Sequence, residues 1–155
     1  MHEVIDIYIK NDFWLVLLAF CSIYINFVSF AIPGTSVLAI LSGPVFGLYL
    51  GFFLVHMCSI TGACVSYFMS MRFGAGVLQS KFPEKFAWFK AKIDENRHNI
   101  FYYFLFLRFA PVAPNLFINM ASGIVGVPFH IFLLGSLIGQ IPFTFLYLKA
   151  GMMLD

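Results

Sequence analysis

Long apolar runs separated by short polar breaks dominate the chain. Residues 13–32, 48–71 and 129–148 carry no acidic or basic side chain except the neutral His56 and His130. A helix that crosses the hydrocarbon core needs roughly 20 such residues. We therefore predict three membrane-spanning helices over these ranges, the first retained rather than removed as a signal peptide, because acidic rather than basic residues precede it.

Two further apolar segments are too short and too interrupted to cross. Residues 33–47 are punctuated by Pro and Gly, and residues 100–127 are split near position 112. Each uninterrupted helical piece would be about 15 Å long, half of a bilayer. We predict re-entrant hairpins at about 33–47 and 100–127. The expected structural breakers of these hairpins are Pro33, Gly34, Gly43, Pro111, Pro114 and Gly123.

The two halves of the chain resemble each other. Ser42-Gly43 in the first half matches Ser122-Gly123 in the second, and each pair is followed by an apolar run that ends in a cation two residues before a glycine. This order predicts an inverted repeat, an arrangement common in membrane transporters. With the basic loop in the cytoplasm, we expect a cytoplasmic N-terminus and a C-terminus on the opposite side.

Residues 72–98 form the hydrophilic part of the chain between the two halves. Within it Phe82, Phe86, Phe89 and Ile93 recur at spacings of 4, 3 and 4, which is one face of a helix. We predict an amphipathic helix within 81–98. Either it lies in the membrane interface, or it packs on the protein's own surface.

The amino-acid composition indicates that the chain lies in a lipid membrane. Of its 155 residues, 61% are hydrophobic and 10% charged, whereas soluble domains carry about 25% charged residues. We predict an all-α integral membrane protein with a polar start (1–12), one membrane domain (13–152) and a short tail (153–155). The net charge is +2, and the basic residues have acidic neighbours rather than forming a cluster of their own, so no nucleic-acid partner is expected.

Arg108 is the candidate functional residue, because a charge inside an apolar arm is costly unless it faces water, carbonyl groups or a phosphate. The alternative is a side chain that reaches the headgroups from within the membrane. Asn115 and Asn119 share a helical face and either line the same cavity or join helices by hydrogen bonds. Thr35, Ser36 and Ser42 are the polar groups of the opposing hairpin. These six residues define a predicted lipid or substrate path.

No motif for covalent or metal chemistry is present. Cys21, Cys58 and Cys64 all lie in apolar runs and are expected to be buried thiols. Acidic residues occur only in 1–12, in 81–98 and at Asp155, which disfavours a proton relay in the membrane. We expect no cofactor, no metal and no enzymatic activity.

Several sequence runs resemble a known family. Ile32-Pro33-Gly34-Thr35-Ser36, Leu41-Ser42-Gly43 and Gly62-Ala63 resemble the first half of the DedA superfamily, also called VTT-domain or SNARE-associated Golgi proteins. The run from Phe106 to Asn119, with the pattern Arg-x-x-Pro-x-x-Pro-Asn-x-x-x-Asn, resembles the eukaryotic transmembrane protein 41 branch. The resemblance covers roughly residues 13–152.

The resemblance implies two opposed re-entrant hairpins that meet near the membrane midplane. It also implies residence in the endoplasmic reticulum (or Golgi) and phospholipid scrambling between leaflets, in support of autophagosome formation. Bacterial relatives carry acidic residues in the first hairpin, where this chain has Thr35-Ser36. That difference favours passive movement of lipids over ion coupling.

Three functions follow from the sequence. The first is a passive phospholipid scramblase, and the second is an ion-coupled transporter or flippase of a lipid-linked or anionic solute. The third is a non-transporting membrane scaffold that binds protein partners at the 81–98 loop. Membrane phospholipids are the expected partners in the first case, and the oligomeric state stays open.

Overall fold

The computed structural model describes residues 2–110 and 112–154, and this part of the chain is helical, with no strand. A π-helical turn at Ser70–Gly74 joins α3 to α4, and a 3-10 turn at Arg97–Asn99 precedes α6. The helices are α1 (His2–Ser29), α2 (Thr35–Phe46), α3 (Leu48–Met69), α4 (Ala75–Lys81), α5 (Pro83–Glu95), α6 (Ile100–Phe109), α7 (Asn115–Val125), α8 (Phe129–Gly139) and α9 (Ile141–Met153).

Among the described residues, three helical stretches are long and apolar enough to cross a membrane. They are Lys10–Ser29, Leu48–Lys81 and Phe129–Met153. They overlap the three spans predicted from the sequence, so the prediction of an all-α integral membrane protein is confirmed. α2 and α7 are the shorter apolar helices between them.

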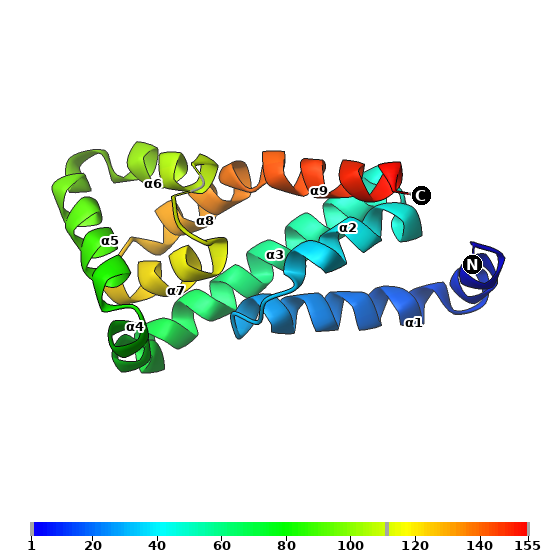
Figure 1. The fold of residues 1–155 in the computed structure, drawn as a ribbon, viewed down its shortest axis with the longest axis horizontal. Helices are drawn as coiled ribbons and strands as arrows, with labels where there is room; N and C mark the ends of the chain where they lie inside the picture. Colours follow the sequence, from blue (N-terminus) through cyan, green and yellow to red (C-terminus); the bar gives the residue numbers. More distant parts are fainter. Residues whose placement is uncertain (1, 111, 155) are drawn as a thin grey trace.

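The helices follow the long axis of the molecule in an ordered way (Figure 1). α1 runs from one end into the middle, α2 returns to that end, and α3 crosses to the far end, where α4 and α5 lie. α6 then enters the middle, α7 returns to the far end, and α8 and α9 cross back. α1 therefore begins, and α9 ends, at the same end of the molecule. The placement of the termini on opposite sides of the membrane stays a prediction, although the chain reverses direction directly after α1.

The reversal after α1 is built by its C-terminal hydrogen bonds. The amide of Ile32 donates to the carbonyl of Phe27 at 2.8 Å, and that of Ala31 to Val28 at 3.2 Å. Ala31 has a φ of 54°, so this is the left-handed residue that ends many helices. Pro33 lies in the same turn, as predicted, and Gly34 completes it with a φ of 118°.

The bend expected inside 33–47 is absent, because α2 continues through Pro44 to Phe46. The bend after α1 takes its place, so the arms of the first hairpin are α1 and α2. In the second half the bend falls between α6 and α7 as predicted, with Pro114 preceding the first residue of α7. The other predicted breaker there, Pro111, lies outside the described residues.

Gly43 and Gly123 lie within α2 and α7, so the prediction that they break the hairpins is wrong. Both are points of close helix packing instead. A Cβ on Gly43 would lie 2.6 Å from the carbonyl oxygen of Leu148 in α9, and a Cβ on Gly123 would lie 2.8 Å from Ser70 Oγ at the end of α3. Small residues allow such contacts between membrane helices.

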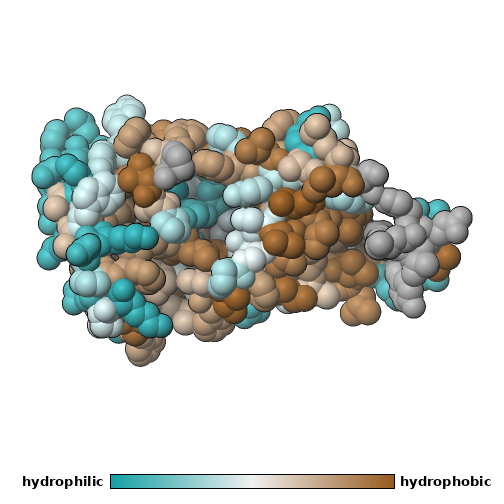
Figure 2. All heavy atoms as spheres, in the orientation of Figure 1, coloured by the Kyte–Doolittle hydropathy of each residue, from teal (hydrophilic) through white to brown (hydrophobic). Residues whose placement is uncertain are grey.

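The amphipathic helix is present as α5, and its apolar face contacts protein. Phe86, Phe89 and Ile93 are buried, and the rings of Phe89 and Phe82 meet the edge of Phe117 in α7 at centroid distances of 5.9 and 6.4 Å. Of the predicted stripe only Phe82 is exposed. The predicted interfacial face therefore packs on the protein's own surface, the alternative that the sequence left open. Hydrophilic residues gather at this end of the molecule (Figure 2).

Candidate functional site

Arg108 lies buried near the C-terminal end of α6, with 4% of its surface exposed. Its Nη1 donates to Oδ1 of Asn115, and its Nη2 donates to Oδ1 of Asn119 at 2.8 Å and to Oγ of Ser136 at 2.6 Å. These partners come from α7 and α8. One guanidinium group therefore ties three helices together.

Two aromatic rings complete the surroundings of the guanidinium. Its central carbon lies 5.1 Å from the ring centroid of Phe104 and 5.2 Å from that of Phe132. Cations at this distance are attracted to aromatic faces. We call the set Phe104, Asn115, Asn119, Phe132 and Ser136 the arginine cage. Every one of its members is neutral, so the cage leaves the positive charge uncompensated.

Buried hydrogen-bond donors remain unused around the cage. Arg108 Nε, Asn119 Nδ2 and Gln140 Nε2 have no partner among the described residues. A buried donor without a partner costs about 1–3 kcal/mol. All three atoms are donors, so the site favours a ligand that brings acceptor oxygens.

A cavity of about 230 Å³ opens beside Arg108. Asn115 lines it from the start of α7, after the loop that follows α6. Thr35 and Ser36 line it from the start of α2. Gln140 contributes from the junction of α8 and α9. The two halves therefore both contribute polar side chains to one cavity whose remaining lining is largely apolar, and hydrophilic atoms appear recessed between hydrophobic ones in the middle of Figure 2.

The cavity wall is held by one further hydrogen bond. Ser59 of α3 donates through Oγ to Oε1 of Gln140 at 2.5 Å, with both side chains buried. This bond fixes the amide of Gln140 so that Nε2 is its free group. It also joins α3 to the start of α9.

The sequence predictions for the site are partly met by this geometry. Arg108, Asn115, Thr35 and Ser36 all line the cavity. Asn119 is fully buried in the cage rather than in the cavity wall. The predicted sixth member does not belong to the site.

That member, Ser42, is fully buried and donates to the carbonyl oxygen of Ala39 at 2.6 Å within α2. Sequence reasoning missed Ser59, Ser136 and Gln140. The first two look like ordinary small residues of spanning helices. Gln140 is the only side-chain amide of the run 129–148, which is a signal that could have identified it.

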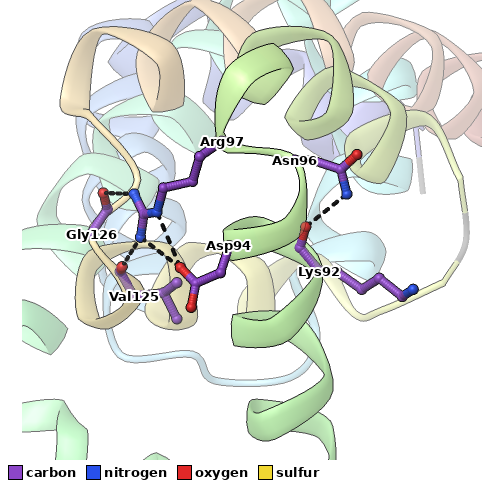
Figure 3. Close-up of polar contacts among 6 residues, drawn as sticks. All are labelled: Lys92, Asp94, Asn96, Arg97, Val125 and Gly126. Atoms are coloured by element: carbon purple, nitrogen blue, oxygen red, sulfur yellow. Dashed lines mark hydrogen bonds and ion pairs between the residues drawn. The ribbon is translucent and has the colours of Figure 1, made fainter.

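Arg97 positions the helix that supplies both asparagines (Figure 3). Its Nη2 donates to the carbonyl oxygen of Val125 at 2.9 Å and its Nη1 to that of Gly126 at 3.3 Å. Asp94 holds the guanidinium in place at 3.1 Å from Nε. A cation at the last carbonyls of a helix satisfies them and complements the helix dipole.

Comparison with known proteins agrees with this architecture. A family model described as the VTT domain matches residues 32–153. The transmembrane protein 41 homologue of Caenorhabditis elegans is 39% identical over 153 residues, which is 99% of this chain and 62% of the relative. The Dictyostelium discoideum homologue is 38% identical over 155 residues, 100% of this chain and 46% of the relative.

Human transmembrane protein 41B is 37% identical over 143 residues, 92% of this chain and 49% of that protein. The chain thus spans about half the length of most of these relatives. No solved structure matches it.

Proposed function

The chain belongs to the VTT-domain family, and on that premise we propose that it moves phospholipids passively between the two leaflets of a membrane. One observation carries the proposal. The starts of α2 and α7 line a single cavity of mixed polar and apolar surface, and among its described lining residues the charge of Arg108 has no carboxylate partner.

A lipid phosphate fits the chemistry of this cavity. The guanidinium group and the unpartnered Nε2 of Gln140 are donors, and phosphate oxygens are acceptors. The acyl tails would stay in the hydrocarbon beside the exposed apolar faces of the spanning helices, while the headgroup passes along the polar wall. Such a path lowers the cost of carrying a charged headgroup through the bilayer.

Matched contacts support an inverted repeat with re-entrant hairpins. Thr35 and Asn115 each begin the second arm of a hairpin and lie 80 positions apart (115 − 35). A Cβ on Gly62 would clash with Val28, and a Cβ on Gly139 would clash with Arg108. Arg108 follows Val28 by 80 positions (108 − 28), and Gly139 follows Gly62 by 77 (139 − 62). We propose that α1–α2 and α6–α7 enter from opposite faces and meet inside the membrane, with α1, which is long enough to cross, as the longer arm of the first hairpin.

The cavity gives no support to an ion-coupled mechanism or to catalysis. None of its described lining residues is an Asp or Glu, and the only charged one is Arg108. The scaffold alternative loses its apolar docking face, since that face of α5 packs on α7. Following the family resemblance, we place the activity in the endoplasmic reticulum, where it would support membrane growth in autophagy.

The test is a reconstitution of the full chain in vesicles that contain a fluorescent phospholipid. An impermeant reductant bleaches only the outer leaflet of empty vesicles, so further bleaching reports lipid movement. We expect the wild-type chain to expose the inner leaflet without any gradient, and Arg108→Gln to slow this strongly. Arg72→Gln removes an exposed cation of the same type and serves as the control.

Asn115→Ala covers the case in which Arg108→Gln fails to fold, because it removes one acceptor and leaves the charge in place. Equal bleaching of wild-type and empty vesicles would refute scrambling. Bleaching that requires a pH difference or a membrane potential would favour the ion-coupled transporter instead.

A further inference from the structure

A second pocket, of about 270 Å³, lies beside the turn that precedes α7. Ala113 lines both this pocket and the cavity beside Arg108. Val112 and Phe117 form the rest of its hairpin wall. The pocket and the cavity therefore share one residue of this turn.

The opposite wall comes from α5 and is chemically mixed. Glu84, Lys85 and Trp88 line it. Glu84 and Trp88 are four residues apart, so they share a helical face. The ammonium group of Lys85 lies 5.8 Å from the ring centroid of Phe82, which in turn meets Phe117. The pocket thus combines an anion, a cation and an aromatic ring.

The two charges of the wall form no ion pair with a described side chain. Ion pairs at this end of the molecule join Lys92 to Glu95 and Arg97 to Asp94. Glu84 and Lys85 have no ionic partner among the described side chains. Both are exposed, and they lie at the end of the molecule where hydrophilic residues gather, the level expected for lipid headgroups (Figure 2).

We propose that this pocket binds the zwitterionic headgroup of a phospholipid, with its ammonium against Trp88 and Glu84 and its phosphate against Lys85. An ammonium is attracted both by an aromatic face and by a carboxylate. The phosphate accepts from the lysine. The idea that this pocket is an entry point to the cavity beside Arg108 rests on the proposed function. The binding of a headgroup in the pocket does not depend on that function.

The chain offers a direct reporter, since it contains two tryptophans, Trp14 and Trp88. In the Trp14→Phe chain, solubilised in a maltoside detergent, Trp88 fluorescence reports on the pocket alone. Titration with dihexanoyl-phosphatidylcholine should give a saturable change. Dihexanoyl-phosphatidylglycerol, which lacks the ammonium, should bind roughly tenfold more weakly, the loss of about one charge-assisted contact.

Variants assign the contacts in the same background. Glu84→Gln should weaken phosphatidylcholine binding by about tenfold without changing phosphatidylglycerol binding, and Lys85→Gln should weaken both. The control Glu95→Gln removes a carboxylate that pairs with Lys92 outside the pocket, and it should change neither. Equal binding of the two lipids, or a wild-type response in Glu84→Gln, would overturn the proposal and leave Trp88 as an interfacial anchor.

This binding test involves no bilayer and no transport. If the chain binds phosphatidylcholine but does not scramble lipids, the proposed function alone is refuted. If it scrambles lipids but does not bind phosphatidylcholine in this test, the headgroup site alone is refuted.

Discussion

The Nη2 atom of Arg108 lies 2.6 Å from Oγ of Ser136, and this hydrogen bond joins α6 to α8. Ser136→Ala removes the bond and leaves both asparagine acceptors. We expect a loss of about 1.5–3 kcal/mol in unfolding free energy, the usual value for a hydrogen bond to a charged group, and slower lipid movement. Thermal unfolding in detergent measures the first effect.

The control for this prediction is Ser80→Ala, which removes an exposed hydroxyl that bonds within α4. It should change stability by less than about 0.5 kcal/mol. Equal effects of the two alanines would show that Ser136 has no special role in holding Arg108.

Gly139 sets the distance between α8 and α6. An added Cβ would collide with the Cβ of Arg108. Gly139→Ala should therefore destabilise the protein by about 1–3 kcal/mol through overpacking and displace the guanidinium. Gly76→Ala is the matched change at an open helical position, where nothing lies within 4 Å, and it should be neutral or stabilising. Denaturation of both variants in the same detergent checks the difference.

Arg97 caps the last carbonyls of α7 from outside the hairpin. Arg97→Gln should lower the unfolding free energy by about 1–2 kcal/mol, because carbonyls at a helix terminus lose a charged donor. The difference in unfolding free energy between the wild type and the variant should be smaller at high salt, because salt screens exposed charges. Arg72→Gln, at an exposed position without a described partner, should show neither effect.

The path of the helices predicts a simple membrane topology. The start of α1 and the end of α9 lie at the same end of the long axis, whereas α5 lies at the other (Figure 1). Cysteines introduced at positions 10 and 153 should react with an impermeant thiol reagent from one side of sealed vesicles, and a cysteine at position 90 from the other. The wild-type chain gives the background of its own thiols, and labelling of positions 10 and 153 from opposite sides would contradict the arrangement.

Much of the fold follows from hydrophobic length and from proline. Residues 48–71 have no alternative to a spanning helix, because an apolar run of this length is stable only in lipid. Arg108, Asn115 and Asn119 were found together because a buried charge needs acceptors and two asparagines four residues apart share a face. In the structure Arg108 donates hydrogen bonds to both asparagines, and their role in a lipid path stays a prediction.

Contacts between distant segments were not available from the sequence. Gly43 was interpreted as a break because glycine and proline interrupt helices in water, whereas here the close approach of Leu148 requires it. Ser136 was missed because a serine in a spanning helix usually bonds its own backbone. The stripe on α5 showed a helix but not the partner that covers it, Phe117.

The close contacts of Gly43 and Gly123 tie each half of the molecule to the long helix of the other. Leu148, against which Gly43 packs, follows it by 105 residues (148 − 43). During synthesis the first hairpin is therefore made before α9, the helix against which it packs, and it lacks this contact until α9 has left the ribosome. A chain truncated before α9 would lack the helix against which the first hairpin packs. Truncation at the C-terminal end should therefore destabilise the N-terminal half of the protein first.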